Sequence, residues 1–96
     1  MSELRTKEVD DFAYVLSQMQ DTDEIYALFE DIMTVREIKE ISQRLAVARM
    51  LDAGKSYAAI EKDTGASATT IARVSKALNY GSGGYRAALD AMAKKA

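Results

Sequence analysis

Apolar residues along this chain recur at intervals of three and four positions, which is the spacing of an amphipathic α-helix. No segment alternates apolar and polar residues with the period of two that a half-buried strand shows. The pattern therefore predicts an all-α protein. A first helix is expected to end around Asp21, and a second, shorter helix follows it. Their apolar positions are Leu4, Phe12, Val15, Leu16 and Met19 in the first helix, and Ile25, Leu28, Phe29, Ile32 and Met33 in the second.

The start of a third helix is marked by the run Thr34-Val35-Arg36-Glu37, which has the form of a capping box. In this motif the threonine hydroxyl and the glutamate carboxylate accept hydrogen bonds from free backbone N–H groups at the helix start. We predict that the helix ends before Gly54, because glycine readily takes the left-handed conformation that terminates helices. Its predicted apolar face comprises Ile38, Ile41, Leu45, Ala48 and Leu51.

Two short helices joined by a tight turn are predicted between residues 56 and 78. Ser56 can cap a helix over 57–64 and Ser67 a helix over 68–78, because a serine hydroxyl accepts a hydrogen bond from the first helical turn. The connection Gly65-Ala66-Ser67 is short enough for a helix-turn-helix. The residues expected to be buried in this motif are Ile60, Ala66, Ile71 and Val74.

A last helix over residues 84–94 is predicted from the apolar positions Tyr85, Leu89 and Met92, which follow a glycine-rich joint. The chain has 96 residues, of which 48% are hydrophobic and 29% charged. This size and composition are typical of one compact globular domain. We therefore predict about six helices in a single domain over residues 1–96.

The sequence contains neither cysteine nor histidine. Such a chain has no thiol nucleophile, no imidazole base and no ordinary zinc site, so we predict no catalytic activity, no metal and no cofactor. The apolar runs are short and interrupted by charges, and we find neither a signal peptide nor a membrane span in the sequence. These features favour a cytoplasmic protein.

The net charge of −2 conceals an uneven distribution of charge. Residues 1–33 contain two basic and nine acidic residues, a net charge of −7, whereas residues 34–96 contain eleven basic and six acidic residues, a net charge of +5. Between Thr64 and Asp90 the chain has Arg73, Lys76 and Arg86 and no acidic residue. This part of the protein could therefore contact a polyanion despite the acidic net charge.

Seven short runs follow one another in a characteristic order and spacing. They are Met33-Thr34, residues 43–51 (QRLAVARML), Ile60-Glu61, residues 64–67 (TGAS), Thr70-Ile71, Arg73-Val74 and residues 78–81 (LNYG). Together they resemble the YerC/YecD family of Trp-repressor-like bacterial DNA-binding proteins, and the resemblance covers most of the chain. It implies an intertwined homodimer with a Trp-repressor-like helical fold, in which residues 1–54 supply the dimerisation helices, residues 56–78 bind DNA and residues 84–94 form the last helix.

The resemblance also implies which residues contact DNA. Ala68, Thr69, Thr70 and Ala72 match the start of the family's recognition helix, where small side chains allow close approach to the major groove and threonine hydroxyls can bond to base edges. The positions of Ala58 and Glu61 match basic residues on the preceding helix of the Trp repressor, and a carboxylate at 61 repels phosphate. The complete set of candidate DNA-binding residues is Ser67, Ala68, Thr69, Thr70, Ala72, Arg73, Lys76, Lys55 and Lys62.

An effector site is implied by the same resemblance. In the Trp repressor, tryptophan lies between two arginines, whose positions match Arg44 and Arg73, and Thr34 matches a further lining residue. Val74 stands where the repressor has glycine and would partly fill the indole slot, and Ala77 replaces a serine. We therefore predict a regulator that does not respond to tryptophan. A simpler alternative for Arg44 is an ion pair with Glu40, four residues earlier on the same helix.

The sequence thus predicts a homodimeric regulator of transcription that binds double-stranded DNA. In the alternative we keep open, the acidic N-terminal half belongs to a non-catalytic protein-interaction module and the helix-turn-helix is only structural. In that case the helix over 68–78 is an exposed polar helix of a bundle.

Overall fold

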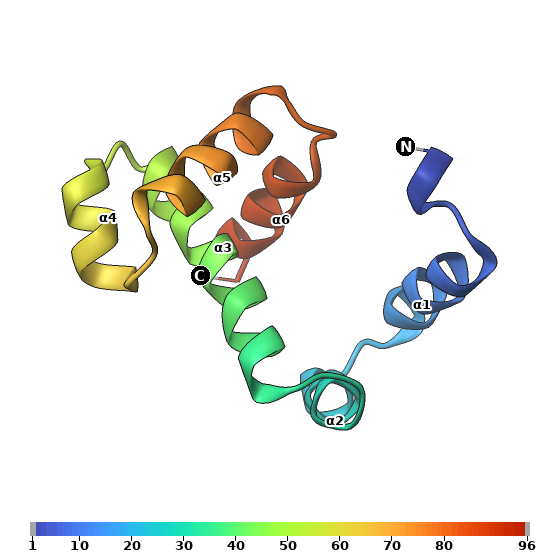
Figure 1. The fold of residues 1–96 in the computed structure, drawn as a ribbon. Coiled ribbons are helices and arrows are strands. Elements are labelled where there is room, and N and C mark those ends of the chain that lie inside the picture. Colours follow the sequence, from blue (N-terminus) through green and yellow to red (C-terminus); the bar gives the residue numbers. More distant parts are fainter. Residues whose placement is uncertain (1, 96) are drawn as a thin grey trace. The chain divides into compact units, whose positions relative to one another are not determined.

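The computed structural model describes residues 2–95, so Met1 and Ala96, the ends of the predicted domain, lie outside the described residues. Within these residues the chain is helical and contains no strand (Figure 1). The elements are a short 3₁₀ turn η1 (Ser2–Leu4) and the helices α1 (Lys7–Gln18), α2 (Thr22–Ile32), α3 (Val35–Asp52), α4 (Tyr57–Thr64), α5 (Ala68–Tyr80) and α6 (Gly84–Ala93). The all-α prediction is confirmed.

Contacts divide the chain into two compact units, Met1–Ile38 and Lys39–Ala96. In the first unit, the first predicted helix is shorter than expected at both ends. Thr6 caps α1 by accepting a hydrogen bond from Val9 N–H at 3.2 Å, which leaves Leu4 in the preceding turn. At the other end Met19 takes an extended conformation, and Asp21 is not the end of α1 but the cap of α2, accepting from Asp23 N–H at 2.9 Å. A short polar side chain that bonds the following backbone favours a helix start over a helix interior.

Neither α1 nor α2 contains a buried residue in the described chain, although both are amphipathic. Their predicted apolar residues are half-buried or exposed. Among the exposed large apolar side chains of this unit are Val15, Tyr26, Ile32 and Val35. The first unit therefore has apolar helix faces that its own residues do not cover.

The capping box at the start of α3 is confirmed. The Thr34 backbone N–H donates to Glu37 Oε1 at 2.9 Å, and the Glu37 N–H donates to Thr34 Oγ1 at 3.1 Å. The bond from the Thr34 N–H is also the main reason why the pKa of the Glu37 carboxyl is lowered. At its other end α3 stops at Asp52, and Gly54 has the predicted left-handed conformation, with φ of +80°.

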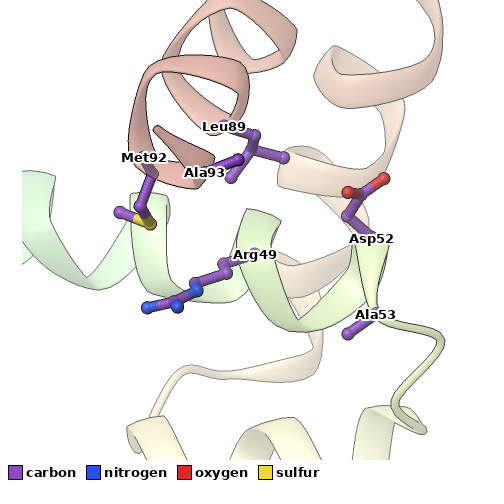
Figure 2. Close-up of a pocket in the computed structure, with 6 residues that line it drawn as sticks. All are labelled: Arg49, Asp52, Ala53, Leu89, Met92 and Ala93. Atoms are coloured by element: carbon purple, nitrogen blue, oxygen red, sulfur yellow. The ribbon is translucent and has the colours of Figure 1, made fainter. Parts of the chain in front are cut away.

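In the second unit, an ion pair connects α6 to the C-terminal end of α3. Arg86 of α6 donates to Asp52 of α3 through two nitrogens, Nη2 to Oδ1 at 2.7 Å and Nη1 to Oδ2 at 3.3 Å. These bonds lower the pKa of the Asp52 carboxyl and raise that of the Arg86 guanidinium. Beside this pair lies a groove of about 280 Å³, with Arg49 and Ala53 on the α3 side and Leu89, Met92 and Ala93 on the α6 side (Figure 2).

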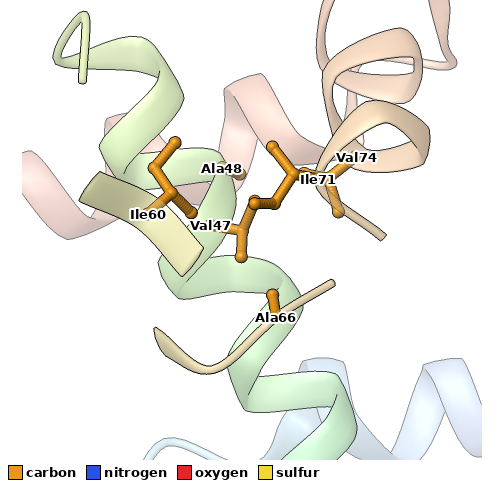
Figure 3. Packing of buried hydrophobic residues seen from close by; sticks show 6 residues of the cluster. All are labelled: Val47, Ala48, Ile60, Ala66, Ile71 and Val74. Carbon is orange, nitrogen blue, oxygen red and sulfur yellow. The ribbon is translucent and has the colours of Figure 1, made fainter. Parts of the chain in front are cut away.

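The core of the second unit is formed where α3, α4 and α5 meet (Figure 3). All four residues predicted to be buried in the helix-turn-helix are buried. They pack with Val47 and Ala48 of α3, and the cluster comprises Val47, Ala48, Ile60, Ala66, Ile71 and Val74. The predicted face of α3 was partly wrong, because Val47 was not included and Ile41 is 52% exposed.

Candidate nucleic-acid interface

The helix-turn-helix is built by the local signals that predicted it. Ser56 caps α4 by accepting from Ala59 N–H at 3.1 Å, and Ser67 caps α5 by accepting from Thr70 N–H at 3.1 Å. Between them Gly65 takes φ of +75°, a left-handed conformation that glycine adopts without strain. The predicted limits of α4 are confirmed, and α5 extends two residues beyond its predicted end at Leu78.

The outward side of α5 carries most of the predicted DNA-binding residues, whereas Lys55 precedes α4 and Lys62 lies on α4. Ile71 and Val74 point into the core, so the positions between them lie on the solvent side. Eight of the nine candidates are exposed, namely Lys55, Lys62, Ser67, Ala68, Thr69, Ala72, Arg73 and Lys76. The spacing of Thr69, Arg73 and Lys76 places them along one face of the helix. Helix α5 therefore presents small, hydroxyl and basic side chains together on one accessible face.

Thr70 differs from the other candidates. It is half-buried, and its Oγ1 lies 3.1 Å from the Ser67 hydroxyl, which donates to it. Thr70 also lines a cavity of about 270 Å³ rather than standing fully on the outer face. Thr69, by contrast, is exposed, and no side-chain hydrogen bond within the described residues engages its hydroxyl. The two adjacent threonines thus have different surroundings.

The cavity at Thr70 brings together two of the three residues implied for an effector. Arg44 from α3 and Arg73 from α5 both line it, with Val74, Ala77 and Tyr85. No acidic residue lines it, and within the described residues Arg44 makes neither an ion pair nor a hydrogen bond, so the expected pair with Glu40 is not formed. Thr34 is not among the lining residues. Its hydroxyl and backbone N–H are engaged in the capping box.

Two polar contacts of the second unit were not anticipated from the sequence. Gln43 Nε2 donates to the Thr64 carbonyl at 3.0 Å, and Arg86 bonds to Asp52. The first contact joins residues 21 positions apart and the second joins residues 34 apart. No periodic pattern or local motif indicates such pairs. Arg86, one of the three basic residues between Thr64 and Asp90, is therefore engaged in a contact between helices of the fold.

Residues 2–95 contain no group of three or more His, Cys, Asp or Glu side chains that could hold a metal ion. None of the described helices is long and apolar enough to cross a membrane.

Comparisons with known proteins agree with the helical arrangement. The model of the family described as Trp repressor protein matches residues 7–93. The uncharacterized protein YerC of Bacillus subtilis (strain 168) is 46% identical over 90 residues, which cover 94% of this chain and 86% of that protein. The crystal structure of a TrpR-like protein from Eubacterium eligens matches with a TM-score of 0.91 at 39% identity, covering 97% of this chain and 96% of that one.

Proposed function

Because this chain belongs to the Trp repressor family, we propose that it is a homodimeric, sequence-specific DNA-binding regulator of transcription without catalytic activity. The observation that carries the proposal is the outward face of α5. On this face the exposed Thr69 lies on the same side of the helix as the exposed cations Arg73 and Lys76, and Ser67 caps the start of the helix. Such a helix can enter the major groove of a duplex.

In the proposed complex the first turn of α5 lies in the major groove. Ala68 and Ala72 are small enough to let the backbone approach the bases, and the Thr69 hydroxyl and methyl contact base edges. Lys76 contacts phosphate, with Lys55 and Lys62 at the border, and Arg73 can serve either phosphate or an anion in the cavity that it also lines. Phosphate contacts supply affinity and fix the register, whereas base contacts supply specificity. Residues 65–89 contain no acidic residue that would oppose these contacts.

We propose a second copy of this chain as the partner of the first unit. Its helices carry exposed apolar side chains and no buried residue, and a two-fold dimer buries the same surface on both subunits. Two helix-turn-helix motifs in one dimer match two half-sites of an operator.

We also propose that the cavity between Arg44 and Arg73 admits an anionic effector and not tryptophan. The support for an anion is the pair of guanidinium groups with no acidic residue in the lining. The support against an indole is Val74, which lines the same cavity and is 2% exposed within the core.

The interaction-module alternative is favoured by the same uncovered helices of the acidic first unit. A salt titration separates the two functions. The full chain is used to select duplexes from a random-sequence pool, and binding of the most enriched duplex is measured between about 50 and 200 mM salt. DNA binding through several phosphates predicts a steep loss of affinity over this range. If no duplex is enriched and no salt-dependent binding is seen, the DNA-binding proposal is wrong.

A further inference from the structure

Gln43 links α3 directly to the turn of the helix-turn-helix. Its side chain is half-buried, and Nε2 donates to the Thr64 carbonyl at 3.0 Å. Thr64 is the last residue of α4, so its carbonyl is one of the group at a helix end that have no partner within the helix. Gln43 supplies that partner from a different helix.

Thr64 also makes hydrogen bonds within the turn that leads to α5. Its hydroxyl donates to the Ile60 carbonyl at 2.7 Å and accepts from the Ala66 N–H at 3.1 Å. Ala66 is buried in the core, and the next residue, Ser67, caps α5. Hydrogen bonds therefore link α3 to Thr64 and Thr64 to Ala66, and the peptide bond to Ser67 connects this group to the end of α5 that carries Thr69.

We propose that Gln43 is a positioning residue for DNA recognition. By holding the Thr64 carbonyl, its amide fixes the turn against α3 and so fixes where the first turn of α5 stands. The inference rests on the proposed DNA-binding function and adds a residue that contacts no DNA itself.

The effect of losing this contact should fall on discrimination and not on general affinity. Base contacts need the first turn of α5 in one register, whereas phosphate attraction tolerates small displacements. Gln43 is uncharged, so its replacement leaves the cations at 62, 73 and 76 unchanged. Binding to unrelated duplexes should therefore persist.

The test compares three variants of the full chain. Gln43→Met keeps the length of the side chain and removes the donor, whereas Gln43→Lys keeps an N–H donor on a flexible side chain. Gln20→Met makes the same chemical change at an exposed residue of the first unit and serves as the control. Each variant is titrated with the duplex most enriched by the wild type and with a scrambled duplex, at temperatures where circular dichroism shows it folded.

For Gln43→Met we expect the ratio of affinities for the two duplexes to fall about five- to tenfold, as loss of one hydrogen bond to a half-buried carbonyl suggests. For Gln43→Met the scrambled-duplex affinity and the salt slope should stay at wild-type values. Gln43→Lys should recover most of the ratio, while its added positive charge strengthens binding to both duplexes. Gln20→Met should keep the wild-type ratio. An unchanged ratio, or an equal loss on both duplexes, would overturn the positioning role.

Amide hydrogen exchange without DNA separates this inference from the proposed function. In Gln43→Met the amides of Gly65, Ala66 and Thr70 should exchange faster, while that of Ala87 at the start of α6 should not change, because its bond to the Gly83 carbonyl lies far from the turn in sequence. Unchanged exchange in the turn refutes the role of Gln43 whatever the wild type binds. Faster exchange in a protein that selects no duplex refutes the DNA-binding function instead.

Discussion

At the scale of single residues, the structure distinguishes side chains that the sequence placed in one group. Thr69 and Thr70 were both expected to contact bases. Thr70 is half-buried and accepts a hydrogen bond from Ser67, whereas Thr69 is exposed. The burial of a residue near a helix start depends on what packs beside it, and sequence spacing alone does not show that. Thr69 is therefore the stronger candidate for base recognition.

Thr69→Ala should reduce the free-energy difference between specific and non-specific binding by about 1–3 kcal/mol, because it removes the hydroxyl and the methyl that we propose to contact base edges. The ratio is measured by titrating an enriched and a scrambled duplex. Thr70→Ala is the comparison and should change the ratio less. If Thr69→Ala lost equal affinity for both duplexes, the proposed docking would be wrong, because a different face of α5 would lie in the groove.

Lys76 should contribute affinity without discrimination, since an exposed ammonium can approach phosphate only as a point charge. Lys76→Ala is expected to weaken binding to all duplexes alike and to reduce the slope of log K against log salt by about one. Lys94→Ala, which removes an exposed lysine after α6, should leave the slope unchanged. A change confined to the enriched duplex would contradict the phosphate role.

The predicted lack of a response to tryptophan rests on Val74. Because it lines the cavity at Arg44 and Arg73, tryptophan should alter neither the melting temperature nor the affinity for DNA. Calorimetric titration with tryptophan checks this directly, and glycine, an amino acid without a ring, is the control ligand. Saturable heat at micromolar tryptophan would show that the steric argument is wrong.

At the scale of elements, the predictions agree with the structure where the sequence signal acts between residues close together in the chain. The limits of α4, the turn glycine and the four buried residues of the helix-turn-helix were predictable, because caps and periodicity act within a few residues. The end of α1 was not, since Asp21 fits either a helix end or a helix start. The hydrogen bonds of Gln43 and Arg86 could not be predicted from local patterns, because their partners are 21 and 34 residues away in the sequence.

The Asp52–Arg86 pair should make the attachment of α6 to α3 depend on pH. The pKa of Asp52 is lowered from 3.8, so its stabilising contribution is present above that pH and is lost as the pH falls through the folded value. The same pair raises the pKa of the Arg86 guanidinium, so its own contribution is lost only in strongly alkaline solution.

Asp52→Asn should therefore lower the melting temperature slightly at pH 7, and the difference from wild type should vanish in acid. Both side chains are partly exposed, so added salt should also reduce it. Asp63→Asn, at an exposed residue of α4, is the control. A difference that persists below the folded pKa would mean that the pair is not its cause.

At the scale of the whole molecule, charge and burial divide the described chain in a similar way. The first 33 residues have a net charge of −7 and the apolar helix faces that no residue of their own unit buries. The remaining residues have a net charge of +5 and contain the buried core. This division supports association through the N-terminal helices and DNA binding through the rest. A small chain whose faces are uncovered gains stability by pairing.

Folding and association should accordingly be coupled. We expect light scattering to give twice the 10.5 kDa mass of one chain and the melting temperature to rise with protein concentration, because mass action favours the folded dimer. Ile32→Glu places a charge among the exposed apolar residues of α2 and should shift the equilibrium to unfolded monomer, whereas Glu30→Gln on the same helix should not. A wild-type monomer that stays fully folded at micromolar concentration, with a melting temperature independent of dilution, would contradict the dimer. Such a monomer would also require another partner to cover α1 and α2, which is the arrangement that the interaction-module alternative describes.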